Sequence, residues 1–351
     1  MNAIVENREL PAARRQSPPR HKLAWLLKRE FWEHKGGFFW APLVAGLVFL
    51  VFTILGGGTA QVFWNKAKLE PGNTTTLNGV QMPTSELDLS RIVQSASPDD
   101  LRQLGDAVNA MTAMTAFWPL MVFGFVVFFY LLGSLYDERR DRSVLFWKSM
   151  PVSDGQTVLS KVLMALLVGP LIASAIAAAV MLAFGIVLSV FIAFNGGNPF
   201  TLYWSHLRPA LIGGSLLAWI PIYALWALPT AGWLMLCSAW ARSKPFLWAV
   251  LVPVLAGVLV SWFEFFDANS RWFWEHVVAR LLVSAWPGSH LFGVHESGYG
   301  IRLTEDSTAM EWMRLAGGLD AFASPSLWIG AAAGLAMLFI ATRLRRWRAD
   351  A

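Results

Sequence analysis

Residues 162–194 of the chain read VLMALLVGPLIASAIAAAVMLAFGIVLSVFIAF, and no charged side chain interrupts them. An α-helix needs about 20 mostly apolar residues to cross the hydrocarbon core of a bilayer. The run is therefore long enough to span a membrane and to tilt or extend beyond it on one side. Its apolar residues are continuous rather than alternating, which favours a helix over a barrel strand.

Five further apolar runs have the length of a membrane span, and the whole composition agrees with them. The chain has 351 residues, of which 56% are hydrophobic and 15% charged, and it holds 19 Trp and 24 Phe. This balance excludes an ordinary water-exposed protein. We predict an all-α polytopic membrane protein with six transmembrane helices, at about residues 38–57, 117–135, 162–194, 211–240, 246–266 and 327–344.

The Lys and Arg residues predict the orientation of these spans. With the N-terminus inside, 19 of them fall in inner segments and nine in much longer outer segments, as the positive-inside rule requires. We therefore expect both termini in the cytoplasm. A disordered basic tail is expected at residues 1–21 and a cytoplasmic tail at 345–351. No nucleic-acid-binding motif accompanies the net charge of +5.

Two large extracytoplasmic loops are predicted at residues 58–116 and 267–326. In the first, Ser97 is suited to cap a helix that begins with Pro98, so the second span would begin outside the bilayer. In the second, residues 271–275 open a predicted interfacial helix that ends before Pro287. The single cysteine, Cys237, lies in an apolar run and cannot form an internal disulfide.

The sequence holds few residues that could catalyse a reaction or bind a metal or nucleotide. Few ionisable residues lie at membrane depth, and Glu264, near the end of the fifth span, is the clearest exception. This scarcity argues against an ion-driven carrier. His290, His295 and Glu296 lack the helical spacing of a zinc protease, and no phosphate-binding GxxxxGK[ST] loop is present. If ATP drives this protein, another chain must bind it.

A dense charged segment lies between the second and third spans, at residues 136–161. Its charges can pair with each other and with a docking surface, and the apolar residues 144–147 follow them. Pro151 then breaks the chain, and Ser153 with Gln156 forms a capping box for the next helix. The segment predicts a short cytoplasmic elbow; the alternative is an ordinary charged loop.

A second signal precedes the first span, at residues 22–37. On a helical projection, the apolar residues Leu23, Leu26, Leu27 and Phe31 share one arc, and charged residues lie opposite. This pattern predicts an amphipathic interfacial helix on the inner leaflet, with a turn into the bilayer at residues 36–37. The alternative is a simple extension of the first span.

These two segments, KREFW at residues 28–32 and ERRDRSVLFWKSMPVSD at 138–154, resemble the permease subunit of an ABC-2 type ABC transporter. The resemblance implies a homodimer in a bacterial inner membrane, two copies of a separate ATPase subunit that binds Mg-ATP, and no cofactor or enzyme activity on this chain. The two outer loops are larger than in the plainest members. The resemblance implies coupling to the ATPase through Lys28, Arg29, Glu30, Trp32, Glu138, Arg139, Arg140, Asp141, Arg142, Phe146, Trp147, Lys148, Pro151, Ser153 and Asp154.

Small and aromatic residues recur within the spans. Small residues at four-residue intervals let helices approach closely in lipid, and they occur in the third span at Gly169, Ala173 and Ala177 and in the sixth at Gly330 and Gly334. In the fourth span, Trp219, Trp226, Trp233 and Trp240 lie near one face over about 30 Å. They form either a packing stripe or, through Trp219, Trp226 and Trp233, a path for an apolar or amphipathic substrate.

Two other classes of function stay open from the sequence. One is a membrane enzyme or enzyme anchor with its site near His290, His295 and Glu296. The other is a membrane sensor or scaffold that binds a ligand through its outer loops. The leading hypothesis is the exporter permease, in contact with membrane lipid and with no nucleic-acid partner.

Overall fold

The computed structural model describes residues 19–69, 74–77, 80–83, 96–142, 152–263, 270–289 and 319–348. Among these residues, six helical stretches are long and apolar enough to cross a membrane. This confirms the predicted number of spans and the character of a multi-pass membrane protein. The six stretches are Gly36–Leu69, Pro98–Arg140, Asp154–Phe194, Pro209–Trp226, Pro245–Trp262 and Pro325–Trp347.

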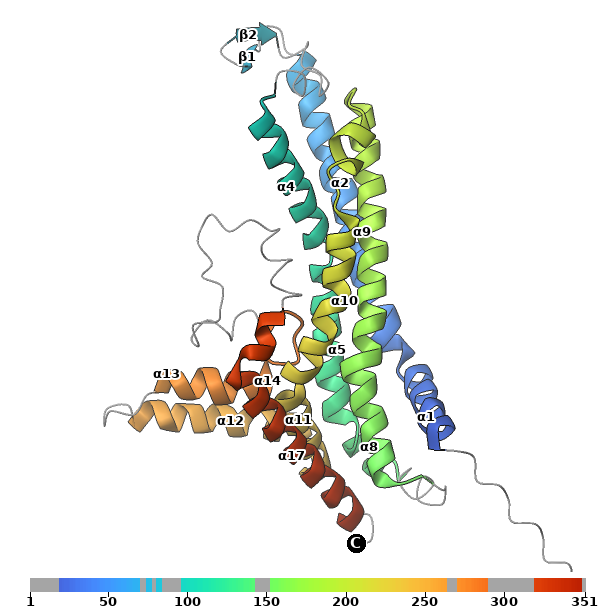
Figure 1. Ribbon diagram of the computed structural model, residues 1–351, viewed down its shortest axis with the longest axis vertical. Coiled ribbons are helices and arrows are strands. Elements are labelled where there is room, and N and C mark those ends of the chain that lie inside the picture. Colours follow the sequence, from blue (N-terminus) through green and yellow to red (C-terminus); the bar gives the residue numbers. More distant parts are fainter. Residues whose placement is uncertain are drawn as a thin grey trace, which may run out of the picture.

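The chain enters the bundle through α1 (Pro19–Glu33), the π-helical turn η1 (Gly36–Trp40) and α2 (Ala41–Leu69). In Figure 1, α1 is tilted away from the line of α2 at the lower end of the molecule. The helix α2 passes the predicted end at residue 57 by twelve residues. Its far end is held to the end of α9 by paired amide side chains, with 2.6 Å from Asn195 Nδ2 to Gln61 Oε1.

The second long stretch is built from α4 (Pro98–Met114), α5 (Phe117–Gly133) and α6 (Tyr136–Arg140). Its predicted start is confirmed, because the Ser97 side chain accepts a hydrogen bond from the Asp100 backbone N–H and the Asp100 carboxylate accepts one from that of Ser97. Before it, β1 (Thr74–Leu77) and β2 (Val80–Pro83) form an antiparallel hairpin. Sequence reasoning missed this hairpin.

The third stretch joins α8 (Asp154–Leu163), the π-helical turn η3 (Met164–Val168) and α9 (Gly169–Phe194). The predicted capping box of Ser153 with Gln156 begins it. The wide turn at η3 arises where the Gly169 N–H reaches the Met164 carbonyl, directly before Pro170, which has no N–H to donate. After α9, the short π-helix η4 (Phe200–Trp204) leads into the fourth span.

The fourth span, predicted over residues 211–240 with interruptions at Pro221 and Pro229, is interrupted in the structure at only one of these two prolines. The segment forms two helices, α10 (Pro209–Trp226) and α11 (Leu228–Trp240), which meet at Ala227. Pro229 cannot donate a hydrogen bond back into α10, whereas Pro221 lies inside α10 without breaking it.

Arg280 compensates for this break. Its guanidinium donates to the Trp226 carbonyl at 3.4 Å and to the Ser326 carbonyl at 3.1 Å, and it lies 3.6 Å from the centre of the Trp226 ring. A cation is favoured at the carbonyl end of a helix. Burial lowers the pKa of Arg280 to about 10, so the side chain still carries its charge at neutral pH.

After α11, the chain forms a helical hairpin that projects sideways from the long helices (Figure 1). Its outgoing arm is α12 (Pro245–Trp262), and its returning arm is α13 (Ser270–Phe273), η6 (Trp274–Val278) and α14 (Ala279–Leu282). The returning arm confirms the helix predicted to open at residues 271–275. The indole N–H of Trp274 donates to the Ser261 hydroxyl at 2.9 Å and ties the two arms together.

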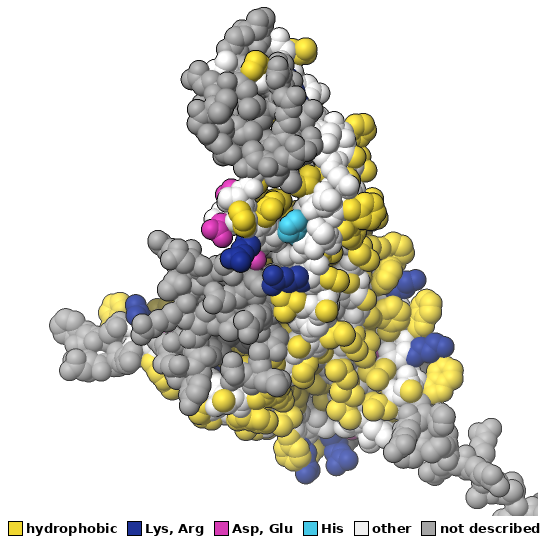
Figure 2. Space-filling view, turned by 45° about the horizontal axis from the view of Figure 1, so that its top comes forward, with side chains coloured by type: hydrophobic (Ala, Val, Ile, Leu, Met, Phe, Trp, Pro, Cys, Tyr) yellow, Lys and Arg dark blue, Asp and Glu magenta, His cyan; other side chains and the backbone are white. Residues whose placement is uncertain are grey.

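The last stretch is the 3₁₀ turn η8 (Leu319–Ala323) and α17 (Pro325–Arg348), which packs along α11. Figure 2 shows hydrophobic side chains over much of the described surface. Exposed Leu, Val, Phe and Trp residues recur along α2, α9, α12 and α17. Apolar patches of this extent are unusual on a water-soluble monomer, and they suit contact with lipid.

The small residues predicted to mark interfaces do so. A Cβ on Gly334 of α17 would overlap backbone atoms of Leu228 in α11, and a Cβ on Gly169 would lie 2.9 Å from a ring carbon of Phe123. Ala173 and Ala177 are buried beside their neighbours. Close backbone approach therefore sets the α11–α17 contact, as expected in lipid, where packing rather than hydrophobic exclusion holds helices together.

Replacing Gly334 with Leu is expected to destabilise this contact by about 1–3 kcal/mol, the usual cost of overfilling a packed interface. Thermal unfolding of the purified protein in a mild detergent measures the effect. Gly213→Leu on α10 is the matched control, since nothing lies within 4 Å of a Cβ there. Equal unfolding temperatures for the two variants would contradict the assignment.

Candidate functional site

Four elements meet at the lower end of the molecule in Figure 1: α1, α6, the start of α8 and the end of α17. We call this the charged end, because three basic and three acidic side chains from these elements pair with one another there. We refer to these six side chains as the charge cluster. They are Arg29, Glu30, Glu138, Asp154, Lys161 and Arg345.

Glu30 and Lys161 form the buried centre of the cluster. Their exposed fractions are 0% and 2%. The Lys161 ammonium lies 3.1 and 3.3 Å from the two carboxylate oxygens of Glu30, and the Tyr130 hydroxyl donates to Oε2 of the same carboxylate at 2.9 Å. Glu30 therefore joins α1 to α5 and α8 at once.

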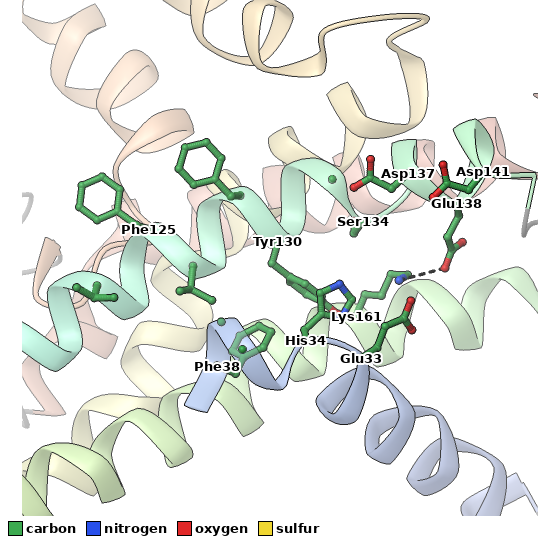
Figure 3. Close-up of a pocket in the computed structure, with 16 residues that line it drawn as sticks. Glu33, His34, Phe38, Phe125, Tyr130, Ser134, Asp137, Glu138, Asp141 and Lys161 are labelled. Carbon is green, nitrogen blue, oxygen red and sulfur yellow. Dashed lines mark ion pairs between the residues drawn. The ribbon is translucent and has the colours of Figure 1, made fainter. Parts of the chain in front are cut away.

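Glu138 of α6 extends the cluster to the last helix. Its carboxylate lies 3.1 Å from the Lys161 ammonium, the pair drawn in Figure 3, and 2.9 Å from the guanidinium of Arg345. Arg345 in turn lies 3.3 Å from Asp154 at the first turn of α8. Three long stretches of the chain are thereby held together at one end.

Such an arrangement is stable only when it is complete. Taking charges out of water costs several kcal/mol for each ion, and close pairing offsets this cost. Removing one partner leaves the other charge buried and uncompensated. The cluster therefore fixes how α1, α6, α8 and α17 sit relative to one another.

A cavity of about 590 Å³ opens beside the cluster, between the α1–η1 junction and the α5–α6 segment. Figure 3 shows how its lining changes along its length, with Phe125 towards one end and Asp137 and Asp141 at the other. Tyr130, His34 and Lys161 lie between these ends. The cavity is therefore apolar at one end and acidic at the other.

The structure divides the predicted coupling residues into two groups. Glu30, Glu138 and Asp154 turn inward into the cluster, with Arg29 partly covered beside them, and the Arg139 guanidinium donates to the backbone carbonyls of Ser238 and Ala241. Ser153 caps α8. The outward group is Lys28, Trp32, Arg140, Asp141 and Arg142.

Four of the predicted coupling residues lie outside the described residues: Phe146, Trp147, Lys148 and Pro151. So do Glu264, His290, His295 and Glu296. The prediction that the coupling set contacts an ATPase stays a prediction.

Sequence reasoning missed the roles of Tyr130, Lys161 and Arg345. One signal was available for the site as a whole. On the helical projection of α1, Glu30 falls in the middle of the arc formed by Leu23, Leu26 and Leu27. A carboxylate at the centre of an apolar arc indicates a buried ion that needs a partner.

The buried side chains of α1 show which face of this helix contacts the rest of the protein. Leu26 is buried, and Leu27 and Phe31 pack against the bundle core. The apolar arc that was expected to lie in the leaflet thus faces protein. The outward face carries Trp25 and Trp32, which are 67% and 58% exposed.

The tryptophans of the fourth span do not form one wall. Trp219 donates to the Ser174 hydroxyl, Trp226 is buried under the Arg280 guanidinium, and Trp233 donates to the Ala249 carbonyl. Trp240, largely exposed, contacts Trp248. Each ring contacts a different neighbour, which favours the packing interpretation.

Comparison with known proteins gave no relative: no family model matches the chain, and no curated protein or solved structure matches it.

The cluster predicts a non-additive response to neutral substitutions. Lys161→Met alone should lower the free energy of unfolding by about 3–5 kcal/mol, because it leaves Glu30 and Glu138 without their shared cation. Adding Glu30→Gln should restore part of this loss. Chemical unfolding in detergent of the two single variants and the double variant measures the coupling, and additive effects would contradict the pairing.

Proposed function

We propose that this chain is the membrane-spanning permease subunit of an ABC transporter in a bacterial inner membrane. It would export a hydrophobic or amphipathic substrate with energy from ATP hydrolysis on a separate ATPase subunit. Two copies of the chain and two of the ATPase would form the complex, with both termini of the permease in the cytoplasm. Mg-ATP would bind the ATPase subunit.

The observation that carries this proposal is the charge cluster. It ties α1 and α6, the two segments that the resemblance assigns to ATPase contact, to the starts or ends of three long apolar stretches. Packed elements linked in this way move together rather than bend independently. A push on α1 or α6 from outside the bilayer would therefore reach the spans.

A surface suited to a soluble partner lies at the same end. Lys28, Trp32, Arg140, Asp141 and Arg142 are exposed there. Mixed charges with an aromatic anchor are typical of protein interfaces. The inward residues would then transmit movement, and the outward residues would make the contact.

The cheapest test is the neighbouring reading frame, which should encode a phosphate-loop ATPase. With that subunit co-expressed, affinity purification of the tagged permease should retain it and yield ATPase activity. Arg140→Glu should reduce the retained ATPase by on the order of tenfold, since losing about 1.4 kcal/mol at an interface has that effect.

Arg102→Glu is the matched control. Arg102 is exposed and pairs with Asp99 three residues before it, as Arg140 pairs with Asp137, but it lies at the opposite end of the same helical stretch. It should leave ATPase retention unchanged. If the unmodified permease retains no ATPase, or if both substitutions act equally, the proposal is wrong.

A further inference from the structure

The cavity beside the charge cluster has the properties of a binding site for a particular class of molecule. We propose that it binds a hydrophobic cation, with its apolar body against α5 and its positive charge at the acidic mouth. The inference goes beyond the proposed function by giving the charge of the ligand. The inference rests on the proposed function only in that the bound cation would be a substrate for export.

The apolar part of the cavity is open for contact. Phe125 and Phe129 line it and remain 44% and 56% exposed, beside Val122 and Val126 on the same helix. Ligand sites in proteins are mostly apolar with a few polar groups that fix orientation. Exposed aromatic faces also attract cations through the ring quadrupole.

The opposite end of the cavity carries an excess of negative charge. The charged side chains that line the cavity are one lysine, Lys161, and four carboxylates: Glu33, Asp137, Glu138 and Asp141. Arg29, which pairs with Glu33, and Arg140, which pairs with Asp137 and Asp141, are not among the lining residues. A cation at the mouth is favoured by this excess, and an anionic headgroup is repelled.

The order of these two surfaces matches how such a molecule lies in a bilayer. A hydrophobic cation partitions with its charge near the headgroups and its apolar part in the hydrocarbon. The apolar lining lies along α5, within a stretch apolar enough to span, and the carboxylates of Asp137 and Asp141 follow at its end. A ligand could therefore move from the bilayer into the cavity while keeping the same orientation.

The cavity also has a wall that can be altered without touching the charge cluster. Gly36 lines it, and nothing lies within 4 Å of a Cβ built there. A large side chain at Gly36 would occupy the cavity without displacing a neighbour. Gly56, on the same helical stretch and equally open, does not line the cavity.

The test uses two probes with the same dodecyl chain and opposite headgroup charge, dodecyltrimethylammonium and dodecyl sulfate. Equilibrium dialysis is done with the full chain in lipid nanodiscs, with no ATP or ATPase subunit, after subtraction of binding to empty nanodiscs. Dodecyltrimethylammonium should bind saturably, and dodecyl sulfate should not. Asp137→Asn with Asp141→Asn should weaken cation binding by about tenfold, as expected for lost charge attraction near a surface.

Gly36→Phe should abolish saturable cation binding, and Gly56→Phe should leave it unchanged. Undiminished binding in the Gly36→Phe protein, or equal binding of the two probes, overturns the proposal. Because no ATPase is present, failure here is separate from failure of the permease proposal, which the ATPase retention experiment decides.

Discussion

The carboxylate of Glu30 is the constraint on which the arrangement of this protein depends. It is fully buried, and a buried carboxylate persists only where a cation and hydrogen-bond donors satisfy it. Lys161 and Tyr130 supply these from two other parts of the chain. Lys161 also pairs with Glu138, and Glu138 pairs with Arg345. The ion pairs that stabilise the Glu30 carboxylate therefore fix α1, α6, α8 and α17 at the charged end.

Three irregular points interrupt the regular helical hydrogen bonds. The wide turns η1 and η3 lie next to the charged end, and the break at Ala227 lies farther along the chain. The α12–α14 hairpin is mostly exposed and apolar, and its partner outside the chain is lipid or protein.

Much of this fold follows from local signals in the sequence. Continuous apolar runs place the spans, and Ser97 and Ser153 mark helix starts through their own side chains. The sequence predicts interruptions at both Pro221 and Pro229, which look alike in sequence, but only Pro229 coincides with a break, and Arg280 caps that break. The charge cluster joins residues more than a hundred positions apart, and helical periodicity carries no information on such pairs.

The central claim is that the charge cluster makes α1 and the end of α17 move as one body. Double electron–electron resonance between spin labels at Ala24→Cys and Arg346→Cys tests it directly; the one natural cysteine, Cys237, is buried. The account predicts one narrow distance distribution, which broadens when Lys161 is changed to Met. A broad distribution in the otherwise unmodified protein, or a narrow one that survives Lys161→Met, would contradict it.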